Sequence, residues 1–268
     1  MNASVIIINY NTFTLTCNCI QSVINKTSGI DYEIILVDNA SSECDPAIFL
    51  EIFPKIKLIR NSENIGFSKG CNVGIQQAKG DIILLLNSDT VLLNNALSIS
   101  TQYLFNQNDV GVVTCRVENQ DGTAQNNCQR FPGIGVRLVE ALRIHKFFSA
   151  RFRGNFLLGS YFSYDKISSP DWVWGTFFLF PKRMLNDFPD KKLSETFWMY
   201  LEDMEWCWLA KKAGYKIAFV PEGRILHLGC GKDFSTIKSN VIKDNYFVFL
   251  DKYYSKFISR MIKLLNNI

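Results

Sequence analysis

The stretch 82–90, Ile-Ile-Leu-Leu-Leu-Asn-Ser-Asp-Thr, decides the fold class of this 268-residue chain. Five consecutive large apolar residues predict a strand buried on both faces, as in a parallel sheet that is covered by helices. The polar residues that follow at once mark the carboxyl end of that strand, where open α/β sheets bind their ligands. This one segment therefore predicts both an α/β core and the place of a functional site.

The same pattern recurs on either side of this strand. Apolar runs predict strands at 5–8, 33–37, 56–59, 82–86 and 110–114, and the segments between them, 14–24, 46–53, 68–78 and 94–105, are long enough for helices. This βαβα order predicts a mostly parallel central sheet flanked by helices. After Gly122 the pattern is irregular to about residue 170. It returns with a regular stretch at 172–180, a helix at about 202–213, and a strand at 216–220 that Pro221 ends.

The composition excludes several classes of protein. With 47% hydrophobic residues, 20% charged residues and a net charge of +4, the chain is typical of a packed globular protein and gives no argument for nucleic-acid binding. No apolar run is long enough to span a membrane, and the N-terminus lacks the features of a secretion signal. We therefore expect a cytoplasmic protein. The eight cysteines form no C-x-x-C pair, which favours buried thiols over a zinc site.

The end of the chain carries the excess of positive charge. From Lys232 onward, seven Lys or Arg residues oppose three Asp residues. We expect one domain over residues 1–231 and a basic, amphipathic helical extension over 232–268. Such a helix suits peripheral contact with an anionic membrane, which would place the protein at the inner face of the cell membrane. Packing of its apolar stripe against the rest of the chain, or a dimer contact, are the alternatives.

Polar side chains follow each of the first four predicted strands. Because the carboxyl ends of parallel strands meet at one edge of a sheet, these side chains predict an acceptor-rich site suited to a nucleotide and a metal ion. The simpler explanation is that Asn, Asp and Ser begin turns. Neither a G-x-G-x-x-G motif after a strand nor a phosphate-binding P-loop motif is present. The residues are Asn9, Asn11, Asp38, Asn39, Asn61, Asn87, Ser88 and Asp89.

These residues resemble the ordered motifs of family 2 inverting glycosyltransferases, which have the GT-A fold, and the rhamnosyltransferase-like branch is the nearest likeness. The resemblance covers about residues 3–229 and rests on the segments 38–42, 64–74, 86–90, 174–176 and 197–205. It implies transfer of a sugar from a nucleoside diphosphate-sugar, dTDP-rhamnose or a UDP-sugar, to a hydroxyl of a cell-surface glycan or lipid-linked glycan. A non-catalytic sugar-nucleotide or glycan-binding module with the same fold is the alternative.

The resemblance also implies a role for individual residues. Asp203, in the segment Glu202-Asp203-Met204-Glu205, would be the catalytic base. Asp89 and His227 would bind a divalent metal, Mn²⁺ or Mg²⁺, with Asn87 in place of the first Asp of the family's D-x-D motif. The residues expected on the donor side are Asn9, Asn11, Asp38, Asn39, Asn64, Gly66, Phe67, Asn72, Asn87 and Ser88. Those expected on the acceptor side are Trp174, Gly175, Thr176, Trp198 and Glu202.

Several of these residues also have a purely structural explanation. The glycines at 66, 70 and 74 recur at helical spacing and would allow close packing against the sheet. Acids in the first turn of a helix complement its dipole without any catalysis. On that helix Glu202 and Glu205 share a face while Asp203 points elsewhere, so the three acids cannot perform one task. By default His227 would be a hydrogen-bonded core residue, although a neutral imidazole also binds metals.

Overall fold

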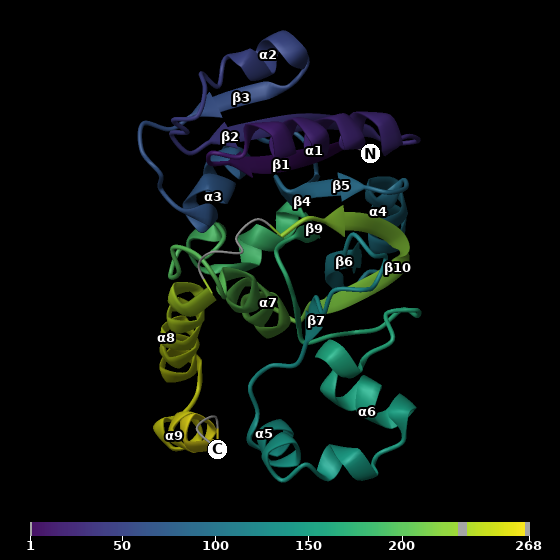
Figure 1. Cartoon of the computed structure of the whole chain (residues 1–268), viewed down its shortest axis with the longest axis vertical. Coiled ribbons are helices and arrows are strands. Elements are labelled where there is room, and N and C mark those ends of the chain that lie inside the picture. The colour runs from purple at the N-terminus through teal and green to yellow at the C-terminus, as the bar shows by residue number, and fades with distance from the viewer. Residues whose placement is uncertain (1, 230–234, 266–268) are drawn as a thin grey trace.

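A single large sheet organises the computed structural model, which describes residues 2–229 and 235–265. Within these residues its strands are β1 (Asn2–Asn9), β2 (Asp31–Asp38), β3 (Lys57–Arg60), β4 (Ile82–Asn87), β5 (Thr90–Leu92), β6 (Val110–Glu118), β9 (Phe177–Pro181) and β10 (Lys216–His227). They are arranged in the order β3-β2-β1-β4-β9-β6-β10-β5 (Figure 1). β9 runs antiparallel to β4 and β6, β5 runs antiparallel to β10, and the other neighbours are parallel. The α/β class is confirmed.

Helices cover both faces of the sheet. The helices beside the sheet are α1 (Phe13–Lys26), α2 (Ile48–Ile52), α3 (Phe67–Gln77), α4 (Ala96–Phe105) and α7 (Glu202–Lys212). Alternate residues of β4 enter two separate cores: Leu84 packs with residues of α1 and α4, whereas Leu85 packs with residues of α3 and α7. The unbroken apolar run of β4 is therefore explained by burial on both faces.

The predicted elements need two corrections. The strand expected to end before Pro221 continues through it to His227, because the pairing of β10 with β6 shifts register between Val220 and Arg224. Such an irregularity tolerates a proline, which cannot donate to the ladder. The stretch 172–180 is not one element: it divides into β8 (Trp172–Val173), which pairs with β7 (Cys128–Gln129), and β9.

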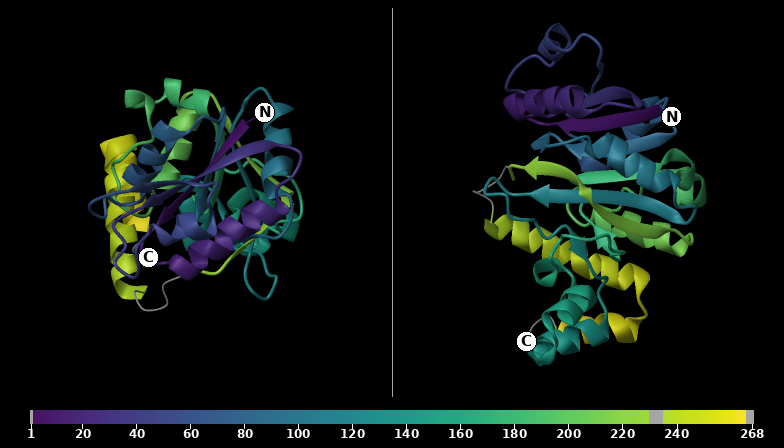
Figure 2. Two further views of the ribbon diagram at one scale, coloured as in Figure 1. Left: turned by 90° about the horizontal axis from the view of Figure 1, so that it is seen from above. Right: turned by 90° about the vertical axis from the view of Figure 1, so that its right-hand side faces the viewer.

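The irregular stretch after Gly122 and the end of the chain form a helical region at one end of the molecule (Figures 1 and 2). It comprises α5 (Ile134–Ala141), α6 (Ala150–Leu157), α8 (Ser235–Tyr253) and α9 (Lys256–Leu265). α9 packs against α5, while α8 packs against α7 and the segment before it. Within the described residues, no helix is both long enough and apolar enough to cross a membrane. The predicted boundary at residue 231 lies outside the described residues.

Candidate active site

The first part of the site is a buried polar network at the carboxyl ends of β1 and β2. The Asn9 amide donates to Asp38 Oδ1 at 2.7 Å and to Ser41 Oγ at 2.9 Å. Ser41 in turn donates its N–H to Asp38 Oδ2 and its hydroxyl to Asp38 Oδ1. Asn11 lies beside this network, where its Oδ1 accepts the Ser42 N–H at 2.8 Å. The network holds the loop after β2 against the end of β1.

A second loop, residues 61–67, is joined to the first through side-chain amides. Asn39 accepts a hydrogen bond from the Asn61 amide at 2.8 Å and donates to the Gly66 carbonyl at 3.1 Å. Asn64 Oδ1 accepts the N–H of Gly66 at 3.0 Å, which bends the chain just before α3. Asn72 lies apart from these residues, because its amide group bonds to Leu193 and Glu195. The donor-side residues other than Asn72 thus gather around two linked loops and the end of β4.

Asp89 and His227 lie side by side, since β5 pairs with the end of β10. His227 Nε2 is 3.4 Å from Asp89 Oδ1, and His227 Nδ1 is 2.8 Å from Gln125 Oε1. The Gln125 amide nitrogen donates to Asn119 Oδ1 and to the His227 carbonyl, which fixes the orientation of that amide. We therefore assign the ring proton to Nδ1, so that the lone pair of Nε2 faces the Asp89 carboxylate.

This pair fits a divalent metal. A histidine ligand ordinarily donates its second ring N–H to a fixed acceptor, as Nδ1 does here to Gln125. The described residues contain no group of three or more His, Cys, Asp or Glu side chains that could bind an ion. Two side-chain ligands leave coordination positions for phosphate oxygens and water, as is usual for Mg²⁺ and Mn²⁺ in phosphate-transfer sites.

Asp203 is held by backbone N–H groups at the start of α7. Gly175 N–H donates to Asp203 Oδ2 at 2.9 Å, and Met204 N–H donates to Oδ1 at 2.8 Å. Burial raises the pKa of the Asp203 carboxyl to about 6, although these hydrogen bonds, which stabilise the carboxylate, lower it. A Cβ atom on Gly175 would lie 3.5 Å from the Phe67 ring and 3.7 Å from Asp203 Cβ. Asp203, Gly175 and Phe67 therefore lie next to one another.

The three acids of α7 have different surroundings, whereas the helical spacing predicted only that Asp203 would point away from Glu202 and Glu205. Glu202 is buried, and this burial, followed by the charge of Asp203, raises the pKa of its carboxyl to about 8. Its Oε2 makes no hydrogen bond within the described part of the chain. Glu205 is turned toward Thr196 and α8: its Oε1 accepts hydrogen bonds from Thr196 and from Lys252 and Tyr253 of α8. Glu205 therefore has a structural environment, whereas Asp203 faces Gly175.

The segments predicted to bind the donor and those predicted to bind the acceptor are joined by backbone hydrogen bonds. Asn87 N–H donates to the Thr176 carbonyl at 3.2 Å, and Phe67 N–H donates to the Trp198 carbonyl at 3.1 Å. The Trp198 side chain is 56% exposed and lies over Gly66. Trp174 is partly buried, and Ser88 Oγ lies 3.1 Å from Thr12 Oγ1. The two halves of the predicted site are thus adjacent.

Two residues of this site were assigned no role from the sequence. Gln125 lies in the irregular stretch, where neither spacing nor a motif singles it out. Ser41 lies inside a motif but is indistinguishable from a residue that merely begins a turn. Both become evident only through their hydrogen bonds to His227 and Asp38.

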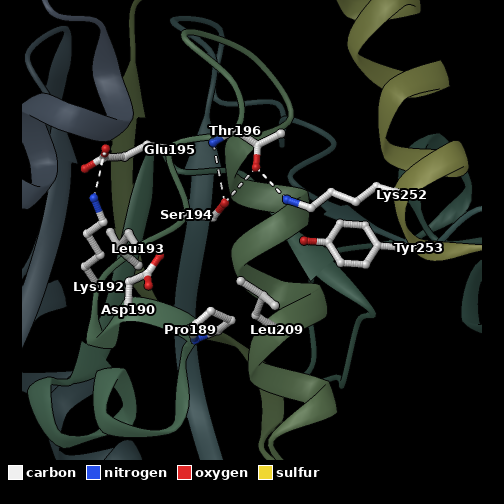
Figure 3. Close-up of a pocket in the computed structure, with 10 residues that line it drawn as sticks. All are labelled: Pro189, Asp190, Lys192, Leu193, Ser194, Glu195, Thr196, Leu209, Lys252 and Tyr253. Carbon is white, nitrogen blue, oxygen red and sulfur yellow. Dashed lines mark hydrogen bonds and ion pairs between the residues drawn. The ribbon is translucent and has the colours of Figure 1, made fainter.

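A cavity of about 470 Å³ lies beside the site, between residues 189–196, α7 and α8 (Figure 3). Its walls carry Lys252 and Tyr253 on one side and Glu195 and Lys192 on the other (Figure 3). None of the residues that line it belongs to the predicted site. The cavity lies next to Thr196 and Tyr253, on the side of α7 to which Glu205 is turned.

The order of the strands in the sheet is that of the GT-A fold. The structure is similar to mannosyltransferase PcManGT from Pyrobaculum calidifontis in complex with GDP-Man and Mn²⁺ (TM-score 0.63, 15% identity, 98% of this chain and 69% of that one). It is also similar to GalNAc-T7 with UDP, GalNAc and Mn²⁺ (TM-score 0.62, 16% identity, 93% of this chain and 48% of that one).

The chain belongs to glycosyl transferase family 2, whose model matches residues 4–166. It is similar to the uncharacterized glycosyltransferase YwdF of Bacillus subtilis, with 32% identity over 89 residues. That match covers 33% of each protein, so the aligned part is about a third of the relative's length. The family predicted from the sequence is confirmed.

Proposed function

We propose that this protein transfers a sugar, with inversion at the anomeric carbon, from a nucleoside diphosphate-sugar to a hydroxyl of a glycan or lipid-linked glycan. The observation that carries the proposal is the environment of Asp203. Two backbone N–H groups orient its carboxylate, and its pKa of about 6 leaves it largely ionised at neutral pH yet more basic than an ordinary aspartate. These are the properties of a general base for an alcohol.

The reaction needs a single displacement. Asp203 takes the proton of the acceptor hydroxyl while the hydroxyl oxygen forms a bond to the anomeric carbon. The bond from that carbon to the diphosphate oxygen breaks, and the diphosphate leaves with the electron pair. One displacement inverts the configuration. Glu202, whose raised pKa keeps it largely protonated at neutral pH, would donate a hydrogen bond to the acceptor.

Asp89 and His227 are the residues that would hold a divalent cation, Mn²⁺ or Mg²⁺. Such an ion neutralises charge on a leaving diphosphate. The Nδ1–H of His227, held by Gln125, supports the metal assignment, as do the Mn²⁺ ions of the two similar structures. Asn87 stands where the D-x-D motif has its first Asp, so Asp89 is the only carboxylate of that motif here.

For the donor, we propose that the linked loops 38–42 and 61–67 bind the nucleoside, with Asp38 at the base or ribose. The likeness to the rhamnosyltransferase branch favours dTDP-rhamnose, and UDP-sugars come next. The similar structures contain different nucleotides, UDP in one and GDP-mannose in the other, so they do not favour a single donor. On the acceptor side we propose Trp174 and Trp198, whose rings would stack on a sugar.

Asp203→Asn tests the proposal, with Asp121→Asn in an exposed turn as the matched control. We expect loss of transfer in the first variant, retained transfer in the second, and thermal stabilisation by the same donor in both. In the wild type, kcat/KM should fall about tenfold per pH unit below about pH 6, because the base becomes protonated. Unchanged transfer by Asp203→Asn would refute the base. Donor binding without turnover in the wild type, whichever acceptor is offered, would favour the binding module.

We also propose peripheral contact with the inner face of the cell membrane, in a cytoplasmic protein, through the C-terminal helix. Ile262 of α9 is fully buried, which supports the alternative that the apolar stripe packs inward. The outward side still carries Phe257, 70% exposed, and Leu264, 62% exposed, together with the exposed cations Lys256 and Arg260. Apolar and basic side chains on one exposed helix suit an anionic lipid surface.

A further inference from the structure

Helix α8 contacts the turn that leads into Asp203. The Asn245 amide donates to the carbonyls of Met199 and Tyr200, each at 2.9 Å. The residues of this turn are unusual, since Tyr200 and Leu201 have φ values of 70° and 68°. Two consecutive side-chain-bearing residues in the left-handed region persist only when the surrounding structure holds them. Asn245 supplies such a hold.

The beginning of α7 depends on this turn. Leu201 is the N-cap of α7, and its side chain makes no capping hydrogen bond. The Leu201 carbonyl accepts the Glu205 N–H at 3.1 Å, so the first turn of α7 continues directly from the left-handed pair. Asp203 lies in that first turn. A shift of the turn would therefore move the Asp203 carboxylate relative to the Gly175 N–H that it accepts.

Further contacts on the same side of α8 reinforce the hold. Phe249, one turn after Asn245, is fully buried in a cluster with Phe197 and Met204. Another turn on, Lys252 and Tyr253 donate to Glu205 Oε1 at 2.8 and 2.6 Å. Positions four and seven or eight residues apart lie on one side of a helix. One side of α8 thus contacts the residues both before and after Asp203.

We propose that Asn245 is a positioning residue of the transfer reaction, holding the 199–201 turn so that Asp203 is correctly oriented toward the acceptor hydroxyl. The proposal rests on the proposed function, because it presupposes Asp203 as the base. The residue type fits the role: the two N–H groups of one amide match two carbonyls, whereas a carboxylate would place acceptor against acceptor. The donor loops have their own hydrogen bonds through Asn39 and Asn61, so donor binding should not depend on Asn245.

The test compares Asn245→Ala with Asn240→Ala, an exposed asparagine on the same helix. Each full-length variant is assayed for kcat, donor affinity, thermal unfolding and the pH dependence of kcat/KM. We expect Asn245→Ala to lower kcat at least tenfold with donor affinity within about twofold of wild type, and Asn240→Ala to match wild type. The acid limb of the pH profile should also move upward in Asn245→Ala, since a misplaced carboxylate loses N–H donors that lower its pKa.

A folded Asn245→Ala with wild-type kcat and an unmoved acid limb would overturn the proposal, as would a loss confined to donor affinity. If Asn245→Ala does not fold at the assay temperature, Asn245→Leu replaces it, because leucine has a similar volume but no N–H donors: a folded variant with lowered kcat supports positioning, whereas wild-type kcat with an unmoved acid limb contradicts it. Absence of transfer in the wild type would instead refute the proposed function, so the two failures are distinguishable.

Discussion

Gly66 is the position where one added methyl group tests the contact between the two halves of the site. Its φ and ψ are 84° and 176°, a region that is essentially restricted to glycine. A Cβ atom there would lie 2.6 Å from Trp198 Cδ1 and 2.7 Å from the Trp198 carbonyl oxygen. The indole can rotate away, but the carbonyl belongs to the backbone and also accepts the Phe67 N–H.

The expected effect of Gly66→Ala has two parts. Holding an alanine in this backbone region costs about 1–3 kcal/mol. Forcing the 197–198 backbone away costs about another 1–3 kcal/mol, the usual range for overpacking. We therefore expect the free energy of unfolding to fall by about 2–6 kcal/mol. The contacts of Gly66 and Phe67 with Trp198 join the loop 61–67 to the segment before Asp203. Because Gly66→Ala would disturb both segments, the KM for the donor should rise and kcat should fall together.

Gly122→Ala is the matched control. Gly122 also has a positive φ, 79°, but a Cβ atom there would meet no described atom within 4 Å. We expect a loss of only about 1–2 kcal/mol from the left-handed backbone, without an effect on transfer. Urea unfolding gives the free energies and steady-state kinetics gives KM and kcat. Equal destabilisation by the two variants, or wild-type kinetics in a folded Gly66→Ala, would refute the argued contact.

Two further predictions concern Glu202 and the membrane. Because the pKa of Glu202 is raised from 4.5 to about 8 by folding, its contribution to stability is present in full below about pH 4.5 and is lost as the pH rises through 8. Glu202→Gln should therefore raise the melting temperature at pH 8 and change it little at pH 5; equal changes at both would contradict the buried acid. For the membrane, the wild type should sediment with vesicles containing phosphatidylglycerol but not with pure phosphatidylcholine, and Phe257→Ser with Leu264→Ser should abolish this. Binding that survives the double variant would place the contact elsewhere.

The sheet was predictable because its strands carry their own signal. The run at 82–86 is apolar at every position, and both faces of β4 are in fact buried. β10 was predicted too short, since Pro221 is ordinarily a stop signal and its tolerance depends on a register shift with β6 that no local pattern reveals. The short β5 was not predicted, because three residues contain too little periodicity.

The candidate site was predictable to the extent that its residues follow strands or match motifs. The family resemblance predicts Asp89 and His227 as ligands of one metal ion, although 137 residues lie between them in the chain. In the structure His227 Nε2 lies 3.4 Å from Asp89 Oδ1. Gln125 and Asn245 were not named. Their roles arise from contacts across more than 40 residues, with His227 and with Met199 and Tyr200, and neither lies in a motif or at a strand end. Amides that hold other groups in place leave no periodic or compositional trace.

The division between the matched and unmatched parts of the chain bears on where acceptor specificity resides. The family model ends at residue 166, before Gly175, Asp203 and His227. The loops proposed for donor binding therefore lie within the shared part, while the proposed base Asp203, the proposed metal ligand His227 and α8 lie beyond it. The two parts meet through the hydrogen bonds Asn87–Thr176 and Phe67–Trp198. If the donor binds to the shared part, the sequence of residues 174–205 can vary while donor binding remains constant. Substitutions in residues 174–205 should accordingly change which acceptor is used before they change which nucleotide binds.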